Sequence, residues 1–207
     1  MIKVVIVEDH RMICEAMQHY IERLEGYEVA AIFDDAGKAA VYCVNREVNL
    51  ILMDVCTNGE ESGFHAARKI KEKSPTTKII VVTSMIDWDF LQEGKKSGVD
   101  SLWYKEFSDL ELAQVIKETM EGQSIYPDKV PQVIVGNAKS CEFTKGEIRV
   151  LRLLIKGKTY KEMASELGIS QDTVKEHVSN MLSKTGYKSK LRLATEVIAK
   201  KLIVPDL

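Results

Sequence analysis

Short apolar runs alternate with helical patterns along the first 121 residues of the chain. Such runs predict strands, and they cover Ile2–Val7, Val29–Ile32, Leu50–Met53, Lys78–Thr83 and Ser101–Tyr104. Helices are expected between and after them, near residues 12–25, 36–46, 63–73, 87–97 and 109–121. Five strand–helix units predict a parallel sheet with helices on both faces, which is an α/β doubly wound domain of the flavodoxin-like type.

Single residues mark where these helices begin and end. Gly26, Gly98 and Gly122 lie where helices are expected to stop. Ser108, with Glu111 three positions later, has the spacing of a capping box and is expected to begin the last helix of this region.

From Phe143 onward the pattern is entirely helical and predicts an all-α four-helix domain. Thr144 and Thr159 are each followed three positions later by a Glu, so both are expected to cap helices. Ser170 is expected to cap the third helix, and the fourth should cover roughly Lys190–Lys201. The short turn between the second and third helices is typical of a helix-turn-helix motif.

The sequence therefore divides into three parts. Residues 1–121 form the predicted α/β domain, and residues 143–207 form the helical domain. Residues 122–142, which contain Pro and Gly and no sustained helical period, are expected to be a linker. Its apolar patch, residues 133–135, is expected to dock on one of the two domains.

Composition indicates an ordinary globular protein, with 45% hydrophobic and 29% charged residues. No apolar run reaches the ~18 residues of a membrane span, and no apolar leader follows Met1. The four cysteines lack C-x-x-C spacing, so they are expected to be reduced thiols outside any disulfide or metal site. We therefore expect a cytoplasmic protein with no membrane partner.

The net charge of −2 conceals an asymmetry along the chain. Residues 1–121 carry 14 Lys and Arg against 22 Asp and Glu, whereas residues 143–207 carry 13 against 7. A basic C-terminal region favours a polyanionic partner for that region alone. On charge alone, a solvated basic surface is an equally good interpretation.

Acidic, hydroxyl and basic residues follow the strands of the first region: Glu8, Asp9, Asp54, Thr83 and Lys105. The carboxyl ends of parallel strands meet at one edge of a sheet, so these side chains should share a crevice. Neighbouring carboxylates repel one another unless a cation lies among them, and Mg²⁺ accepts carboxylate, water and phosphate oxygens. The set predicts a phosphoryl site with Asp54 as nucleophile, although an acidic surface with an unrelated Lys is the simpler alternative.

The third helix of the C-terminal region has an apolar side and a polar side. Polar groups able to contact base edges and phosphates are Lys175, Glu176, Ser179, Asn180 and Lys184. This arrangement favours DNA binding, although a plain helical bundle would tolerate it. His177 has no second or third metal ligand nearby in the sequence, so we do not expect a metal site there.

The first region resembles the receiver domain of two-component response regulators. The matching motifs are Val7–His10, Leu52–Val55, Val82–Ser84 and Tyr104–Lys105. The resemblance implies phosphorylation of Asp54, with Thr83 and Lys105 contacting the phosphoryl group. It also implies Mg²⁺ bound by Asp9, Asp54 and the backbone carbonyl of Cys56, with Glu8 acting through water.

Residues 143–203 resemble the LuxR-type DNA-binding domain. The resemblance rests on motif residues that include Thr144, Glu147, Gly157, Glu162–Ala164, Thr173–Lys175, His177–Val178 and Met181–Leu182. It implies base contacts from Lys175, Glu176 and Ser179. It implies backbone contacts from Thr173, His177, Asn180 and Lys188, and a phosphate contact from Lys161. The fourth helix is implied to pair two copies on DNA.

Together, the resemblances imply a response regulator of the NarL/LuxR class. A histidine kinase would phosphorylate it with Mg²⁺, and the active homodimer would bind a double-stranded DNA operator. Two departures from receivers stand out: the loop 56–63 is one residue longer, and Leu102 occupies a position where an aromatic residue is common.

Two alternatives stay open. The departures favour a DNA-binding regulator whose receiver is uncoupled from phosphorylation. An aspartate-nucleophile phosphatase is the other possibility, but such enzymes typically have a second Asp where this chain has Cys56.

Overall fold

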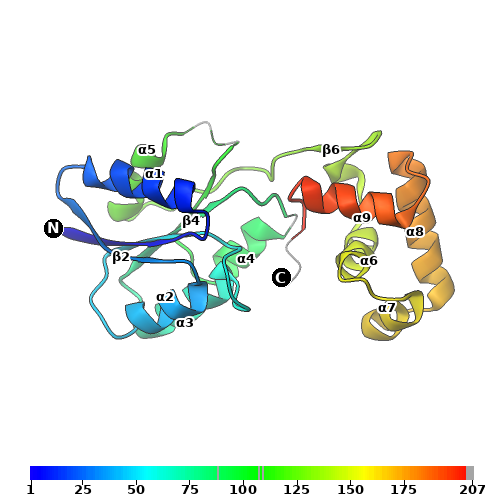
Figure 1. The fold of residues 1–207 in the computed structure, drawn as a ribbon, viewed down its shortest axis with the longest axis horizontal. Coiled ribbons are helices and arrows are strands. Elements are labelled where there is room, and N and C mark those ends of the chain that lie inside the picture. The colour runs from blue at the N-terminus through cyan, green and yellow to red at the C-terminus, as the bar shows by residue number, and fades with distance from the viewer. Residues whose placement is uncertain (88, 107, 109, 204–207) are drawn as a thin grey trace. The chain divides into compact units, whose positions relative to one another are not determined.

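A computed structural model of the chain describes residues 1–87, 89–106, 108 and 110–203. These residues form two compact units (Figure 1). The first runs from Met1 to Met85 and from Asp89 to Lys129. The second runs from Val130 to Ile203 and also includes Ile86 and Asp87. Among the described residues, no helix has the length and apolarity needed to cross a membrane.

The first unit is a five-stranded parallel sheet with the strand order β2-β1-β3-β4-β5. Its strands are β1 (Ile2–Val7), β2 (Tyr27–Phe33), β3 (Leu50–Met53), β4 (Lys78–Thr83) and β5 (Ser101–Tyr104). Its helices are α1 (Arg11–Glu22), α2 (Ala36–Cys43), α3 (Gly63–Lys73), α4 (Phe90–Lys96) and α5 (Leu112–Met120). This order confirms the doubly wound fold, because the chain reverses direction across the sheet after β2.

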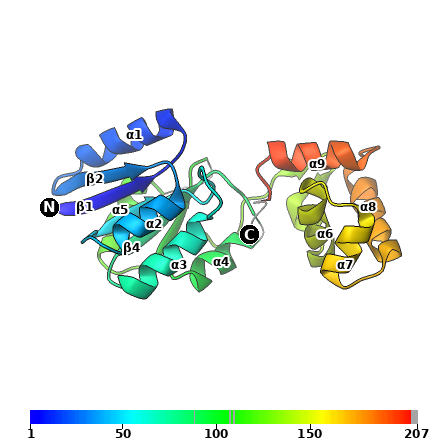
Figure 2. The same ribbon diagram turned by 60° about the horizontal axis from the view of Figure 1, so that its bottom comes forward.

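Helices cover both faces of this sheet (Figures 1 and 2). On one face, α1 and α5 pack their apolar side chains against alternate residues of the inner strands. On the other face lie α2, α3 and α4, where Phe64 and Phe90 pack edge to face with ring centroids 5.2 Å apart. Because both faces are covered, the inner strands are almost continuously apolar and buried.

The loop 56–63 is tied to the neighbouring strand end by hydrogen bonds. The hydroxyl of Thr57 accepts from the backbone N–H of Ala36 at 3.0 Å, and the N–H of Asn58 donates to the carbonyl of Asp34 at 2.9 Å. Gly59 has φ = +105°, a conformation that other residues rarely adopt. The lengthened loop is therefore anchored against the end of β2.

The predicted start of the fifth helix is wrong. Ser108 does not cap it; its hydroxyl accepts a hydrogen bond from the backbone N–H of Tyr104 at 2.9 Å instead. The N-cap is Glu111, and α5 begins at Leu112. The Ser hydroxyl closes the turn after β5, a local bond that competes with helix capping. Position 109, where the helix was expected to start, lies outside the described residues.

The helix expected near 87–97 also begins later, at Phe90. Position 88 lies outside the described residues. Asp87 is not helical, because it and Ile86 are buried within the second unit. Tertiary packing therefore overrides the helical pattern at this helix start.

The second unit is helical apart from a small hairpin at its beginning. Its elements are β6 (Ile134–Val135), β7 (Ala138–Lys139), a 3₁₀ turn (Ser140–Glu142), α6 (Lys145–Ile155), α7 (Tyr160–Leu167), α8 (Gln171–Thr185) and α9 (Lys190–Ala199). Val135 is fully buried and packs in the core of this unit. The apolar patch at 133–135 thus docks on the helical unit, as expected.

The predicted helix caps of the second unit are confirmed. Thr144 and Glu147 form a capping box at α6, and Thr159 and Glu162 form one at α7. The hydroxyl of Ser170 caps α8 by accepting from the N–H of Thr173 at 3.0 Å. Each cap satisfies backbone donors that a helix start leaves unpaired.

Glu147 also joins α6 to α8. Its Oε2 accepts from the N–H of Thr144 and from Lys184 Nζ, both at 2.7 Å. Burial alone would raise the pKa of Glu147, but the bonds from Lys184 and Thr144 outweigh it and lower the pKa below its usual value. The Glu147 side chain is 3% exposed, so its charge depends on these partners.

This lowered pKa predicts an acid-dependent loss of stability. Above the unfolded pKa of about 4.3, the ionised carboxylate stabilises the folded state; the contribution is lost as pH falls through the lower folded pKa. Glu147→Gln should lower the free energy of unfolding at pH 7 by about 1.5–3 kcal/mol. It should also flatten the stability curve below about pH 4.3. Urea titrations from pH 3 to 7 measure both effects, and parallel curves for the two proteins would contradict the assignment.

Candidate functional site

Three charged side chains meet at the carboxyl edge of the parallel sheet, as the sequence predicts. Lys105, after β5, places its Nζ 2.5 Å from Glu8 Oε2 and 2.8 Å from Asp54 Oδ2. Glu8 and Asp54 follow β1 and β3, which are neighbours in the sheet. The side chains of Glu8, Asp54 and Lys105 are 0%, 9% and 11% exposed, so the three charges are shielded from water.

This burial sets the protonation of the group. Burial raises the pKa of Asp54 and the nearby Glu8 carboxylate adds to the effect, while Lys105 opposes it. Burial alone would lower the pKa of Lys105, but Asp54 and Glu8 together raise it. The ammonium therefore keeps its proton and is the cation that these carboxylates share. The second oxygen of Asp54 accepts from the N–H of Val55 at 2.6 Å.

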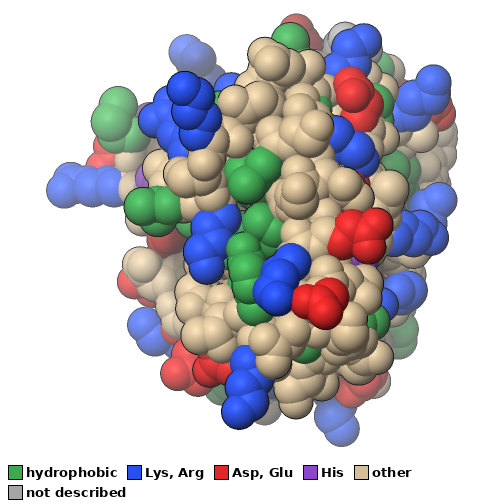
Figure 3. All heavy atoms as spheres, turned by 90° about the vertical axis from the view of Figure 1, so that its right-hand side faces the viewer, with side chains coloured by type: hydrophobic (Ala, Val, Ile, Leu, Met, Phe, Trp, Pro, Cys, Tyr) green, Lys and Arg blue, Asp and Glu red, His purple; other side chains and the backbone are tan. Residues whose placement is uncertain are grey.

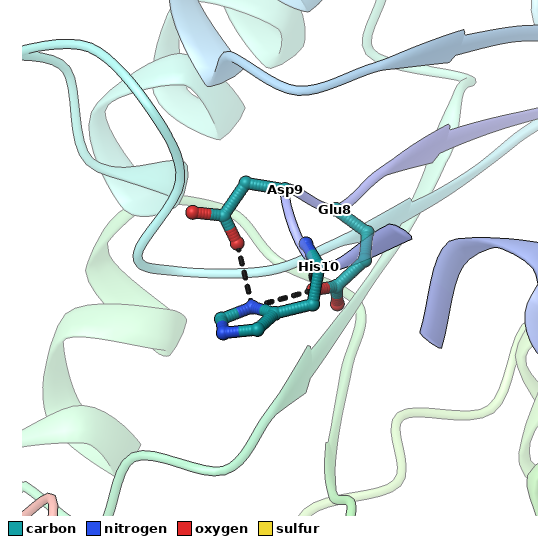
Figure 4. Close-up of side chains that lie close together, drawn as sticks. All are labelled: Glu8, Asp9 and His10. Carbon is teal, nitrogen blue, oxygen red and sulfur yellow. Dashed lines mark hydrogen bonds and ion pairs between the residues drawn. The ribbon is translucent and has the colours of Figure 1, made fainter. Parts of the chain in front are cut away.

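Asp9 and His10 extend the acidic group toward solvent (Figure 4). His10 Nδ1 lies 2.8 Å from Asp9 Oδ1 and 3.2 Å from Glu8 Oε1. Ligand atoms of Glu8, Asp9 and His10 all lie within 4.8 Å of one another. His10 is not among the residues that the sequence predicts for the site, although it directly follows the acidic pair.

The carboxylate oxygens of Glu8, Asp9 and Asp54 are suitable ligands for a hard divalent cation. Asp9 Oδ1 is buried and contacts His10 Nδ1 at 2.8 Å, a contact that a cation bound there would replace. Carboxylate oxygens from two strand ends are the ligands that Mg²⁺ takes in proteins. Cys56, whose backbone carbonyl was expected to contribute, is half-buried two residues after Asp54.

Thr83 lies at the end of β4, fully buried, and its hydroxyl accepts from the N–H of Met85 at 3.1 Å. Its Cα partner on the neighbouring strand is Tyr104, which is also buried. Leu102, at the position where receivers commonly have an aromatic residue, is a core residue. An aromatic residue thus pairs with Thr83, two residues after the position where receivers commonly have one.

The polar side of α8 faces solvent, as predicted. The sequence-predicted DNA contacts that are exposed are Lys161, Lys175, Glu176, Ser179, Asn180 and Lys188. The opposite side of the helix packs Val174, Val178 and Met181 in the core. Figure 3 shows Lys and Arg side chains spread over the side of the second unit that faces the viewer. Such a surface can contact a phosphate backbone and base edges together.

Two of the predicted DNA contacts also have structural roles. Thr173 is half-buried and donates its N–H to the capping hydroxyl of Ser170. His177 is half-buried, and its ring lies so close to Gly146 that a Cβ there would approach His177 Cε1 to 2.8 Å. The small residue at 146 therefore lets α8 pack closely on α6.

The outer side of α9 remains apolar in places. Leu191 and Ile198 are 74% and 54% exposed. They are seven positions apart, which is about two helical turns, so they lie on the same side of the helix.

Comparison with known proteins places both units in families. Residues 4–117 match the family "Response regulator receiver domain", and residues 142–197 match "Bacterial regulatory proteins, luxR family". The chain therefore belongs to the two-component response regulators, in the NarL/LuxR class that joins a receiver to a LuxR-type DNA-binding domain. This confirms the resemblance of both regions.

Relatives in the same class match nearly the whole chain. It is 32% identical over 188 residues to the response regulator protein VraR of Staphylococcus epidermidis, covering 88% of this chain and 90% of the relative. It is 29% identical over 202 residues to the transcriptional regulatory protein LiaR of Bacillus subtilis, covering 94% and 95%. These relatives are regulators.

Solved structures share the fold. RcsB from Salmonella enterica serovar Typhimurium, bound to promoter P1flhDC in the presence of the phosphomimetic BeF3-, has a TM-score of 0.63 and 19% identity. That match covers 95% of this chain and 97% of RcsB. A LuxR-family regulator from Aurantimonas sp. SI85-9A1 has a TM-score of 0.55 and 26% identity, covering 59% and 87%.

The shared ammonium leads to a stability prediction. Lys105→Met should leave Glu8 and Asp54 as adjacent buried carboxylates without a cation, which costs about 3–5 kcal/mol. Urea unfolding in EDTA, followed by circular dichroism, measures the change. Lys117→Met, at an exposed position of α5, is the matched control and should change stability little. Equal effects of the two substitutions would contradict a structural role for the Lys105 ion pairs.

Proposed function

We propose that a histidine kinase phosphorylates Asp54 in a Mg²⁺-dependent reaction, and that this phosphorylation controls dimerisation and operator binding. The observation that carries the proposal is the contact of Lys105 with both Asp54 and Glu8 at the edge of the sheet. It joins a nucleophile, a positive charge and a cation-binding carboxylate in one shielded crevice. The receiver and LuxR-type families of the two units support the same function.

The transfer requires few groups. A carboxylate oxygen of Asp54 attacks phosphorus, the bond from phosphorus to the donor nitrogen breaks, and an acyl phosphate forms on Asp54. Lys105 stays protonated and contacts a phosphoryl oxygen. The Thr83 hydroxyl leaves the N–H of Met85 and donates to another oxygen. Catalysis rests on positioning and charge neutralisation, and the protein modifies only itself.

The metal would be held by oxygens of Asp9, Asp54 and the Cys56 carbonyl, with Glu8 acting through water. Bound Mg²⁺ supplies positive charge that offsets the negative charge of the incoming phosphoryl group. The closeness of the Glu8 and Asp9 carboxylate oxygens, which lie within 4.8 Å of one another, supports this arrangement.

The DNA-binding step would use α8 in the major groove. Lys175, Glu176 and Ser179 would contact base edges. The proposed backbone contacts are Thr173, His177, Asn180, Lys188 and Lys161. The exposed Leu191 and Ile198 of α9 would pair two copies on a two-half-site operator, because an isologous interface uses the same apolar side on both.

Phosphorylation is tested by the mass of the intact protein after incubation with Mg²⁺ and acetyl phosphate. We expect one added phosphate in the wild type and none in Asp54→Ala. Elution volume, measured on the same samples, should shift to that of a dimer only in the phosphorylated wild type. Equal labelling of the variant would reject Asp54 as acceptor. Labelling that leaves elution and DNA affinity unchanged would favour the regulator with an uncoupled receiver.

Base readout is tested by a matched pair of substitutions in the second unit. A DNA sequence selected from a random library by the phosphorylated protein serves as the operator. Glu176→Ala should change the preferred base at one position, whereas Lys188→Ala should weaken binding to all sequences and reduce the salt slope by about 1. A uniform loss of affinity in Glu176→Ala would mean that Glu176 acts only through its charge.

A further inference from the structure

A cavity of about 620 Å³ lies between α1 and the start of α5, beside the end of β5. All of the described residues that line it belong to the first unit. We refer to it as the α1–α5 cavity. Sites that bind small molecules in proteins typically have volumes of about 300–1,000 Å³, so this cavity is large enough for a ligand of that class.

The wall of the α1–α5 cavity is largely apolar and aromatic. Its apolar part includes buried side chains from both helices, Met17 and Leu112. Trp103 and Tyr20 add two rings, and a hydrogen bond orients each of them. The indole N–H of Trp103 donates to the carbonyl of Leu110 at 2.8 Å, and the Tyr20 hydroxyl accepts from the N–H of Ala113 at 2.8 Å. Rings held in this way favour a ligand with a flat apolar body.

The charged groups of the cavity favour a cation. Glu106 and Glu111 line it, and both are exposed. Glu111 is the N-cap residue of α5, but its side chain makes no capping hydrogen bond. Lys105 lines the cavity too, but its ammonium binds Glu8 and Asp54, so its positive charge is offset. The helix start adds about half a positive charge, which two carboxylates outweigh.

We propose that the α1–α5 cavity binds small organic cations in which a flat apolar body carries a protonated amine. The body contacts the rings of Trp103 and Tyr20, and the amine lies beside Glu106 and Glu111. Aromatic rings attract an organic ammonium group through their negatively polarised faces, and a carboxylate forms charge-assisted hydrogen bonds with it. A neutral or anionic ligand with the same body lacks both of these interactions.

The α1–α5 cavity also adjoins the phosphoryl site. Lys105 lines it, as does Ser84, which directly follows Thr83. A cation bound there adds positive charge beside a group of carboxylates, which weakens the repulsion of an anionic phosphoryl donor. The ligand should therefore speed the phosphorylation of Asp54. This consequence rests on the proposed function, whereas the binding of the ligand does not.

Binding is tested with three compounds that share one apolar body: naphthylethylammonium, neutral naphthylethanol and anionic naphthylpropionate. The indole N–H signal of Trp103 in proton–nitrogen NMR spectra of the full chain follows the titration, and Trp88→Phe assigns it. The ammonium should bind with a dissociation constant on the order of 1 mM or lower. The other two compounds should bind about fivefold or more weakly. Equal affinities, or no saturable shift with the ammonium up to ~10 mM, overturn the proposal.

The location of the site is tested by filling the cavity. Ala16 is an exposed residue of α1 that lines it, so Ala16→Phe adds a ring there without replacing a core side chain. This variant should lose the saturable shift, whereas Ala16→Ser should keep it. Binding that survives Ala16→Phe overturns the proposal. Circular dichroism of both variants confirms that the fold is retained.

The charge preference is tested on α5, and this test also serves if Ala16→Phe folds poorly. Glu111→Gln should weaken binding of the ammonium by about two- to fivefold and leave binding of the alcohol unchanged. Glu121→Gln removes an exposed carboxylate at the other end of the helix and should change neither. Equal effects of the two substitutions on the ammonium overturn the proposal.

A second copy of the chain is the competing occupant, and sedimentation of the unphosphorylated protein distinguishes it. We expect a monomer that binds the ammonium. A dimer that Ala16→Phe dissociates and that excludes the ammonium would assign the cavity to a second copy and overturn the proposal.

The effect on phosphorylation is measured by intact mass with acetyl phosphate and Mg²⁺. Saturating ammonium should raise the initial rate about twofold or more in the wild type and leave Ala16→Phe unchanged. An unchanged rate in the saturated wild type rejects the coupling to the phosphoryl site. If Asp54 accepts no phosphate under any condition, the proposed function fails, while a saturable shift that Ala16→Phe removes still supports the ligand site.

Discussion

Two buried carboxylates that share one ammonium are the constraint on which the first unit depends. Glu8 and Asp54 lie at adjacent strand ends, shielded from water, and would repel each other if both were ionised without a cation. Lys105, which follows a third strand, supplies that cation. The sheet therefore holds two negative charges and one positive charge in contact. A group that enters this site would change the balance of charges directly, which supports the proposal that a phosphoryl group acts as the signal there.

In the second unit, the buried charge of Glu147 is compensated at the start of a helix. Glu147 completes the cap of α6 and also binds Lys184 of α8, so one carboxylate fixes the helix start and the helix pairing together. The other polar residues of α8, among them Lys175, Glu176, Ser179 and Asn180, stay exposed, whereas Thr173, His177 and Lys184 are half-buried. A rigid helix with an exposed polar side is what sequence reading in a groove requires.

Much of the fold follows from local patterns. All five strands and the helix caps at Thr144, Thr159 and Ser170 agree with expectation, because apolar periodicity and capping act within a few residues. Two helix starts were predicted wrongly, one because of a competing local hydrogen bond and the other because of packing with residues distant in the sequence. The hydroxyl of Ser108 bonds the strand end instead of the helix, and the segment at Asp87 is drawn into another unit.

The sequence by itself determined the order of elements, the edge at which the acidic residues gather and the polar side of α8. Each of these depends on residue spacing along the chain. Only the tertiary structure decided that Lys105 binds Glu8, 97 residues away, and that Asp87 binds Arg152, 65 residues away. Such pairs depend on burial, because a charge removed from water needs a partner of opposite charge. The periodicity of the sequence does not show which distant residue will be that partner.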